Sequence, residues 1–152
     1  MTSRRFLLSA LALATCGSAL ASAEDPTDKL TRESTLIVIA TPTAVRFVKD
    51  KEVIAGAKAL DPKDPRVYRV LTETTFSVSS VVKGDLAVRS LQLTHYSYDS
   101  ASPIMVAPQL INFTAGSGTR YLMFLRSNDG IHYVVAGDEM NPANFIFQLR
   151  NE

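Results

Sequence analysis

The most constraining feature of this chain is a long alternating segment, VYRVLTETTFSVSSVVK, at positions 67–83. A period of two is typical of a β-strand with one buried face. That face carries Val70, Phe76, Val78 and Val82 among small polar residues, and we expect it to line the inside of the fold. A strand of this length has to curl, as the strands of small barrels do, so the segment predicts a barrel.

The alternating segment stops at Lys83-Gly84-Asp85, which is either a turn or a loop that holds an anion or a partner. We interpret it as a turn. Gly84 supplies backbone freedom and the side chain of Asp85 favours turn geometry, while Lys83 ends the strand. An anion or partner role for Lys83 is the alternative.

Further strands are predicted on both sides of this segment. One covers residues 35–48 and has a bend or bulge at Pro42. Three more cover residues 86–99, 118–127 and 131–137, and a hairpin turn at 128–130 joins the last two. A final strand or helical turn is predicted within 138–152. Residues 50–66 are predicted to be an insertion that could form a helical turn or two within 52–60, and residues 100–118 to be irregular. Five or six mainly antiparallel strands without a long helix predict an all-β fold, a small closed barrel.

The N-terminus has the pattern of an export signal. Arg4 and Arg5 precede an apolar run at 6–20, which is shorter than the roughly 20 residues of a transmembrane helix. Small residues at 21–23 predict cleavage between Ala23 and Glu24. We therefore expect a signal peptide (1–23), a polar tether (24–34) and a single β-barrel domain (35–152), exported to the periplasm or secreted by a bacterium, with no transmembrane segment after the signal is removed.

Two features of the signal leave alternatives open. The paired arginines suit either twin-arginine or ordinary Sec export. Cys16 lies in a sequence that resembles a lipoprotein box, so anchoring through an acylated Cys16 is an alternative to a soluble product.

The composition excludes several kinds of site from the processed chain. Cys16 is the only cysteine, so cleavage after Ala23 removes disulfides, thiolate nucleophiles and cysteine zinc sites. The formal charge of +1 falls to −1 once Arg4 and Arg5 leave with the signal. A nearly neutral protein does not concentrate phosphate backbones, so we expect no nucleic-acid partner.

Two short motifs carry a resemblance to a known group. The first comprises Phe76, Val78, Val82, Lys83 and Gly84, and the second Gly118, Tyr121, Leu122, Phe124 and Leu125. With the strand order around them, they resemble the bacterial exported OB-fold proteins related to tissue inhibitors of metalloproteinases and netrin modules. The resemblance spans residues 35–137 and implies a five-stranded antiparallel Greek-key barrel, OB-fold-like, with little helix.

The best-known activity of that group does not carry over. Those inhibitors chelate a zinc ion through the amine and carbonyl of an N-terminal cysteine, whereas the predicted first residue here is Glu24. The resemblance therefore implies a fold and assigns no inhibitory residue.

Candidate catalytic and metal-binding residues are few. His95 lies near Ser97, Asp99 and Ser100 in sequence, which makes a hydrolase using His95 with a nearby serine conceivable. We favour a strand histidine bonded to the backbone. Four carboxylates, Asp61, Asp64, Asp138 and Glu139, lie in turns without the spacing of a calcium site, so we predict no metal and no cofactor.

Three tyrosines, Tyr96, Tyr98 and Tyr121, are candidates for an aromatic binding face. Barrels of this type stack bases or sugars on such residues. The alternative is that they partly cover the barrel.

The leading functional expectation is an exported, non-enzymatic β-barrel module that binds a protein or another macromolecule of the cell envelope. One alternative is a protease inhibitor that uses the loops at 50–66 and 100–118. The other is the His95 hydrolase.

Overall fold

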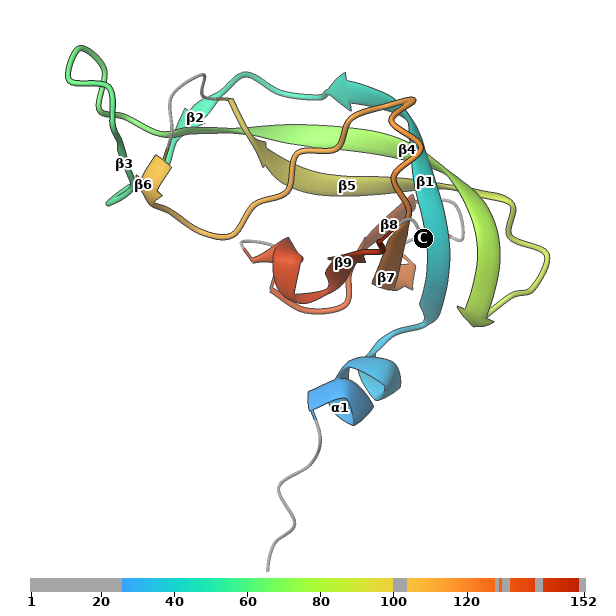
Figure 1. The fold of residues 1–152 in the computed structure, drawn as a ribbon. Helices are drawn as coiled ribbons and strands as arrows, with labels where there is room; N and C mark the ends of the chain where they lie inside the picture. Colours follow the sequence, from blue (N-terminus) through green and yellow to red (C-terminus); the bar gives the residue numbers. More distant parts are fainter. Residues whose placement is uncertain (1–25, 100–103, 128, 130–131, 139–140, 151–152) are drawn as a thin grey trace, which may run out of the picture.

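The predicted long strand forms β4 (Tyr68–Lys83), which runs through the whole molecule (Figure 1). The computed structural model describes residues 26–99, 104–127, 129, 132–138 and 141–150. The inward side chains of β4 are buried from Val70 to Val78, at every second residue. The alternation in the sequence therefore marks the face that lines the core.

Five strands close a barrel. Strand β4 pairs with β1 (Leu36–Phe47) and β5 (Ser90–Tyr98), β5 with β8 (His132–Val135), β8 with β7 (Tyr121–Ser127), and β7 returns to β1. The β5–β8 pair is parallel and the other four are antiparallel. The small all-β barrel expected from the sequence is thus confirmed.

The main core lies inside this barrel. Its largest fully buried side chains include Phe76 on β4, Leu91 and Leu93 on β5, and Met123 and Leu125 on β7. Strand β1 bends where the sequence predicted. Its register with β4 shifts between Pro42 and Ala44, because proline cannot donate a ladder hydrogen bond.

The expectation that Val82 lines the inside of the barrel was wrong, since 62% of Val82 is exposed. Two consecutive residues of β1, Ile37 and Val38, pair with Lys83 and Val81, which leaves Val82 as an extra residue in a bulge. In the same way, the next pairs on β4 are Ser80 and Val78, which leaves Ser79 in a second bulge. Each bulge breaks the period-two alternation. Val81 packs against the main core in place of Val82.

The segment predicted as a polar tether contains a helix, α1 (Pro26–Glu33), the one α-helix among the described residues. Leu30 packs against the main core, and both the amide and the hydroxyl of Ser34 donate to its carbonyl oxygen. The helix lies below one end of the barrel in Figure 1. The polar composition concealed the helix, in which Leu30 is the residue that packs against the main core.

The insertion between β1 and β4 does not form the helical turns considered for residues 52–60. It forms β2 (Glu52–Val53), which pairs with β4, and β3 (Lys58–Ala59), which pairs with β6 (Ile104–Val106). Gly56 between β2 and β3 has a φ of 77°, which a helix does not tolerate. These strands lie at the end of β4 and β5 away from α1 (Figure 1), over a second core made by Ile54, Ala59, Val67 and Leu110.

The C-terminal segment contains both structures considered for it. A short 3₁₀ helix, η1 (Pro142–Asn144), leads into β9 (Ile146–Gln148), which pairs with β7. Strands β7 and β8 pair as an antiparallel hairpin, but Asn128 and Gly130 of the predicted turn lie outside the described residues.

Candidate functional site

The Lys83-Gly84-Asp85 loop joins the helix to the barrel. Lys83 Nζ donates to the carbonyl oxygens of Thr31 (2.6 Å) and Ser34 (2.7 Å), at the C-terminus of α1. Gly84 has a φ of 108°, and the carboxylate of Asp85 accepts from the amide of Ala87. The lysine is therefore engaged with backbone oxygens, and the turn interpretation accounts for each of the three residues.

His95 is a core residue with 4% exposure. Its Nε2 lies 2.9 Å from the hydroxyl of Thr74, its Nδ1 lies 3.2 Å from the carbonyl oxygen of Tyr96, and its ring meets that of Phe113 edge to face. Burial lowers the pKa of His95 to about 4. The imidazole is thus neutral at pH 7.

The residues near His95 in sequence are bonded elsewhere. The hydroxyl of Ser97 lies 2.6 Å from that of Thr72, and the carboxylate of Asp99 forms an ion pair with Lys51 at 3.4 Å. Ser100 lies outside the described residues. The described part of the chain therefore brings no serine and carboxylate together on His95.

The three candidate tyrosines are divided between the two cores. Tyr96 and Tyr98 pack against the second core, and Tyr121 packs against the main core. The hydroxyl of Tyr98 donates to the carbonyl oxygen of Pro108. Arg69 on the neighbouring strand lies over the Tyr96 ring, 4.3 Å from its centroid. Burial raises the pKa of Tyr121.

The candidate metal ligands serve local turns. Asp61 accepts from the backbone amide of Lys63. Hydrogen bonds from Arg66 lower the pKa of Asp64. Asp138 accepts from the side chain of Asn141. No group of three potential metal ligands occurs within the described ranges, and Glu139 lies outside them.

Sequence reasoning missed a cluster of exposed apolar side chains where β1 ends and the insertion begins. Phe47 is 67% exposed, and Val45, Val48 and Val53 lie close to it in the chain and are also exposed. Burial in β1 ends at Pro42, and the residues from Thr43 to Phe47 are all exposed. The signal that could have found the cluster is the position of these residues after the bend at Pro42.

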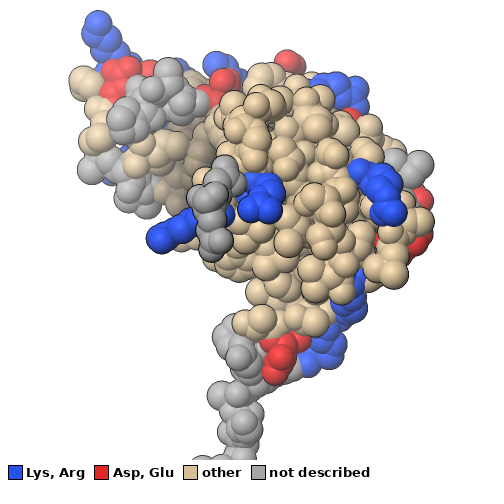
Figure 2. Space-filling model, turned by 45° about the vertical axis from the view of Figure 1, so that its right-hand side comes forward, with Lys and Arg blue, Asp and Glu red and all other residues tan. Residues whose placement is uncertain are grey.

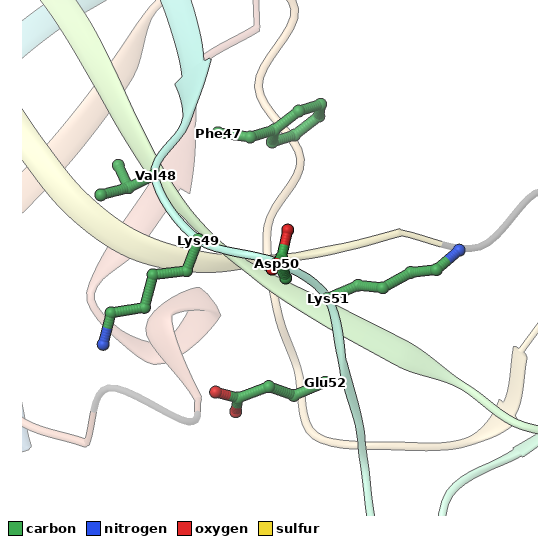
Figure 3. A pocket seen from close by; sticks show the side chains of 6 residues that line it. All are labelled: Phe47, Val48, Lys49, Asp50, Lys51 and Glu52. Atoms are coloured by element: carbon green, nitrogen blue, oxygen red, sulfur yellow. The ribbon is translucent and has the colours of Figure 1, made fainter.

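A groove of about 630 Å³ adjoins this cluster and is lined by residues 47–52 (Figure 3). The side chains of these residues fan outward: Phe47 points away from Lys49 and Glu52, and Lys51 points in a third direction. Small-molecule sites use a few convergent polar groups. The polar side chains of this groove do not converge on one point, so the groove is better suited to contact with the surface of a macromolecule than to a small ligand.

The end of β1 also has an unpaired edge. From Thr41 to Phe47, β1 pairs with β4 alone among the described strands, because its pairing with β7 ends at Ala40. The amide of Gly116 donates to the carbonyl oxygen of Pro42, so a loop covers the first part of this edge. We call residues 44–47 the open β1 edge.

A small cavity of about 90 Å³ lies beside this edge. Val45 and Phe47 line it together with Thr72, His95, Ser97 and Phe113. Val45 and Phe47 therefore adjoin the inner face of the barrel sheet. Side chains docked on the edge would meet this mixed polar and apolar lining.

Charges are scattered on the surface. In Figure 2 the middle of the barrel face is largely uncharged, and acidic and basic side chains alternate around its margin and on the insertion. In the described part of the chain no helix has the length and apolar character needed to cross a membrane. Ala23 and Glu24, at the predicted cleavage site, lie outside the described residues.

Comparison with known proteins adds no family. No protein-family model matches the chain, and no curated protein matches it with significant similarity.

Proposed function

We propose that this chain is an exported, non-enzymatic binding module of the cell envelope that recognises a protein partner through the open β1 edge and the apolar cluster around it. The observation that carries the proposal is the exposure of Val45 and Phe47 on one face of an unpaired strand edge, with Val48 exposed on the other face. Exposed apolar patches and open edges are features that monomeric proteins tend to avoid unless a partner covers them.

Export to the periplasm or the medium is part of this proposal. It rests on the signal pattern at residues 1–23, with cleavage before Glu24. The closed barrel agrees with the resemblance to the exported OB-fold proteins related to metalloproteinase inhibitors and netrin modules, and we propose this kinship on the strength of the two motifs. A fold of this kind serves as a scaffold, so its function depends on the surface that the barrel presents.

The geometry gives less support to the two alternatives, the hydrolase and the protease inhibitor. The hydrolase needs a serine activated by His95, whereas Ser97 bonds to Thr72 and His95 is buried among apolar and hydroxyl side chains. The loop-based protease inhibitor shares the insertion at 50–66 with our proposal. A panel of proteases, none of them slowed by the protein, would remove that alternative.

The test is partner capture with matched variants. The processed protein, purified from cells that export it, is used to capture partners from envelope extracts, and the partner is identified by mass spectrometry and then purified. Binding is measured for the wild type, for Phe47→Lys and for Leu86→Lys, a control because Leu86 is exposed in a turn outside the apolar cluster. We expect Phe47→Lys to weaken binding at least about tenfold, equal to roughly 1.4 kcal/mol, and Leu86→Lys to leave it unchanged.

Two results would contradict the proposal. One is saturable binding that is insensitive to Phe47→Lys. The other is turnover of an ester or peptide substrate that disappears in His95→Ala.

A further inference from the structure

We propose that the open β1 edge accepts an extended peptide segment of the partner as an added strand, and that this segment carries an acidic residue between two apolar ones. The inference rests on the proposed function and names how the module holds its partner. Strand addition to a sheet edge is an established mode of peptide recognition, in which main-chain bonds supply affinity and alternate side chains supply specificity.

The main-chain groups needed for an added strand point outward at two residues. The amide of Val48 donates to the carbonyl oxygen of Leu71 on β4. Peptide groups of an antiparallel pair point alternately toward the partner strand and away from it. Arg46 and Val48 therefore bond to β4, while the N–H and C=O groups of Val45 and Phe47 point to the open side.

The side chains at the edge also alternate. Val45 and Phe47 pair with the buried residues Thr74 and Thr72, so they share the inner face of the sheet. Residues opposite each other on neighbouring strands lie on the same face. An added strand would therefore place two of its side chains beside Val45 and Phe47, and apolar side chains fit there best.

The peptide residue between these two apolar residues would point to the other face of the sheet, beside Arg46. Arg46 pairs with Glu73, its side chain is 68% exposed, and its Nη2 lies 2.7 Å from a carboxylate oxygen of Glu73. A guanidinium group has five N–H donors, so it can bind a second carboxylate. Beyond the end of the edge, exposed Lys49 and Asp50 carry opposite charges, so Arg46 is the group that sets the preference. An acidic residue is the complement of this position.

A second copy of the chain fits the edge less well. A two-fold arrangement that bonds Val45 of one copy to Phe47 of the other sets the two Arg46 side chains directly opposite each other. Like charges in that position are destabilising. A register centred on Val45 sets Phe47 opposite the bulge at Thr43, and one centred on Phe47 sets Val45 opposite Lys49, beyond the end of β1. The observations therefore favour a different chain as the occupant.

The experiment uses two blocked peptides, TTVEVTT and TTVKVTT, titrated separately into the processed protein while backbone amide resonances are recorded by NMR. We expect the glutamate peptide to shift the amides of Val45 and Phe47 and to bind about tenfold more tightly than the lysine peptide. Arg46→Glu should reverse this preference. Val45→Pro should abolish binding by either peptide, since it removes an outward N–H and spares the ladder to β4.

Because Val45→Pro changes the backbone, the charge reversal in Arg46→Glu provides an independent readout. Equal affinities of the two peptides, shifts confined to another surface, or no shifts at millimolar peptide would each overturn the inference. A dimer that forms at rising protein concentration with the same amides protected would overturn it in favour of a second copy. If neither peptide binds while partner capture still depends on Phe47, the added-strand inference is wrong and the proposed function stands. If no partner is captured, the proposed function itself is contradicted.

Discussion

Lys83 Nζ donates a hydrogen bond of 2.7 Å to the carbonyl oxygen of Ser34, 49 residues earlier in the chain. A second bond of 2.6 Å joins it to the carbonyl oxygen of Thr31. The last carbonyl groups of a helix lack partners within the helix, and a cation there also meets the negative end of the helix dipole. The end of the longest strand therefore caps the helix that precedes the barrel.

Replacing Lys83 by methionine should release α1 from the barrel. We expect the free energy of unfolding to fall by about 1–2 kcal/mol, because two hydrogen bonds from a charged group are lost at a partly exposed site. Amides of residues 30–34 should exchange faster with solvent. Lys63→Met, in an exposed loop, is the matched control and should change neither quantity. Unchanged exchange in Lys83→Met would show that Leu30 holds the helix by itself.

Gly84→Ala should be more costly than the same change at another glycine with positive φ. A Cβ atom on Gly84 would lie 2.9 Å from the carbonyl oxygen of Thr35, whereas one on Gly116 meets nothing within 4 Å. Gly116→Ala therefore bears only the backbone cost of about 1 kcal/mol, and we expect about 2–3 kcal/mol for Gly84→Ala. Denaturant unfolding of both variants measures the difference. Equal losses would mean that the loop relaxes freely.

His95 should make the protein less stable in mild acid. Its pKa is about 4 in the folded state because of burial, below the 6.5 of an exposed histidine, so the unfolded chain binds the extra proton between these values. Stability should fall as the pH drops from 6.5 toward 4, by about 3 kcal/mol in all.

Carboxylates also titrate near the lower end of that range, so the contribution of His95 is isolated by comparison with His95→Gln. We expect the variant to have a lower free energy of unfolding than the wild type at pH 7 and a flatter dependence on pH. Parallel pH profiles for the two proteins would refute the assignment of the acid sensitivity to His95.

Asn112 should anchor the loop beside the apolar cluster. Its side chain donates to the carbonyl oxygen of Tyr98 at 3.0 Å and accepts from the Tyr98 amide at 2.8 Å. Asn112→Ala should lower the free energy of unfolding by about 1 kcal/mol, since two exposed backbone groups exchange their side-chain partner for water. Thr114→Ala, two residues along an exposed stretch, is the control. Melting temperatures that fall equally in both variants would contradict this role.

The barrel could be predicted from the sequence because its information is local and periodic. The alternation at 67–83 predicted β4, and Pro42 predicted the bend in β1. The exchange of Val81 for Val82 at the core could not be predicted, because bulges depend on the register with β1. Helix α1 was hidden for a similar reason, since its cap, Lys83, is remote in sequence.

The candidate site was less accessible to sequence reasoning. Val45 and Phe47 continue an apolar β-branched run. The bend at Pro42 is a local signal that the strand changes direction there, but it does not tell whether the strand then ends inside the barrel or extends past it. Their exposure follows from the end of the β1–β7 pairing at Ala40, which is a tertiary property. Histidine and tyrosine candidates drew attention through their chemistry, and the fold uses them in its cores.

Residue-resolved amide hydrogen exchange shows whether a partner covers the open β1 edge. We expect the amides of Val45 and Phe47 to exchange fast in the processed protein alone and to become protected when the captured partner is bound. The amide of Arg46, already bonded to β4, should change little. Protection of other amides, with those of Val45 and Phe47 still exchanging fast in the complex, would show that the partner binds a different surface.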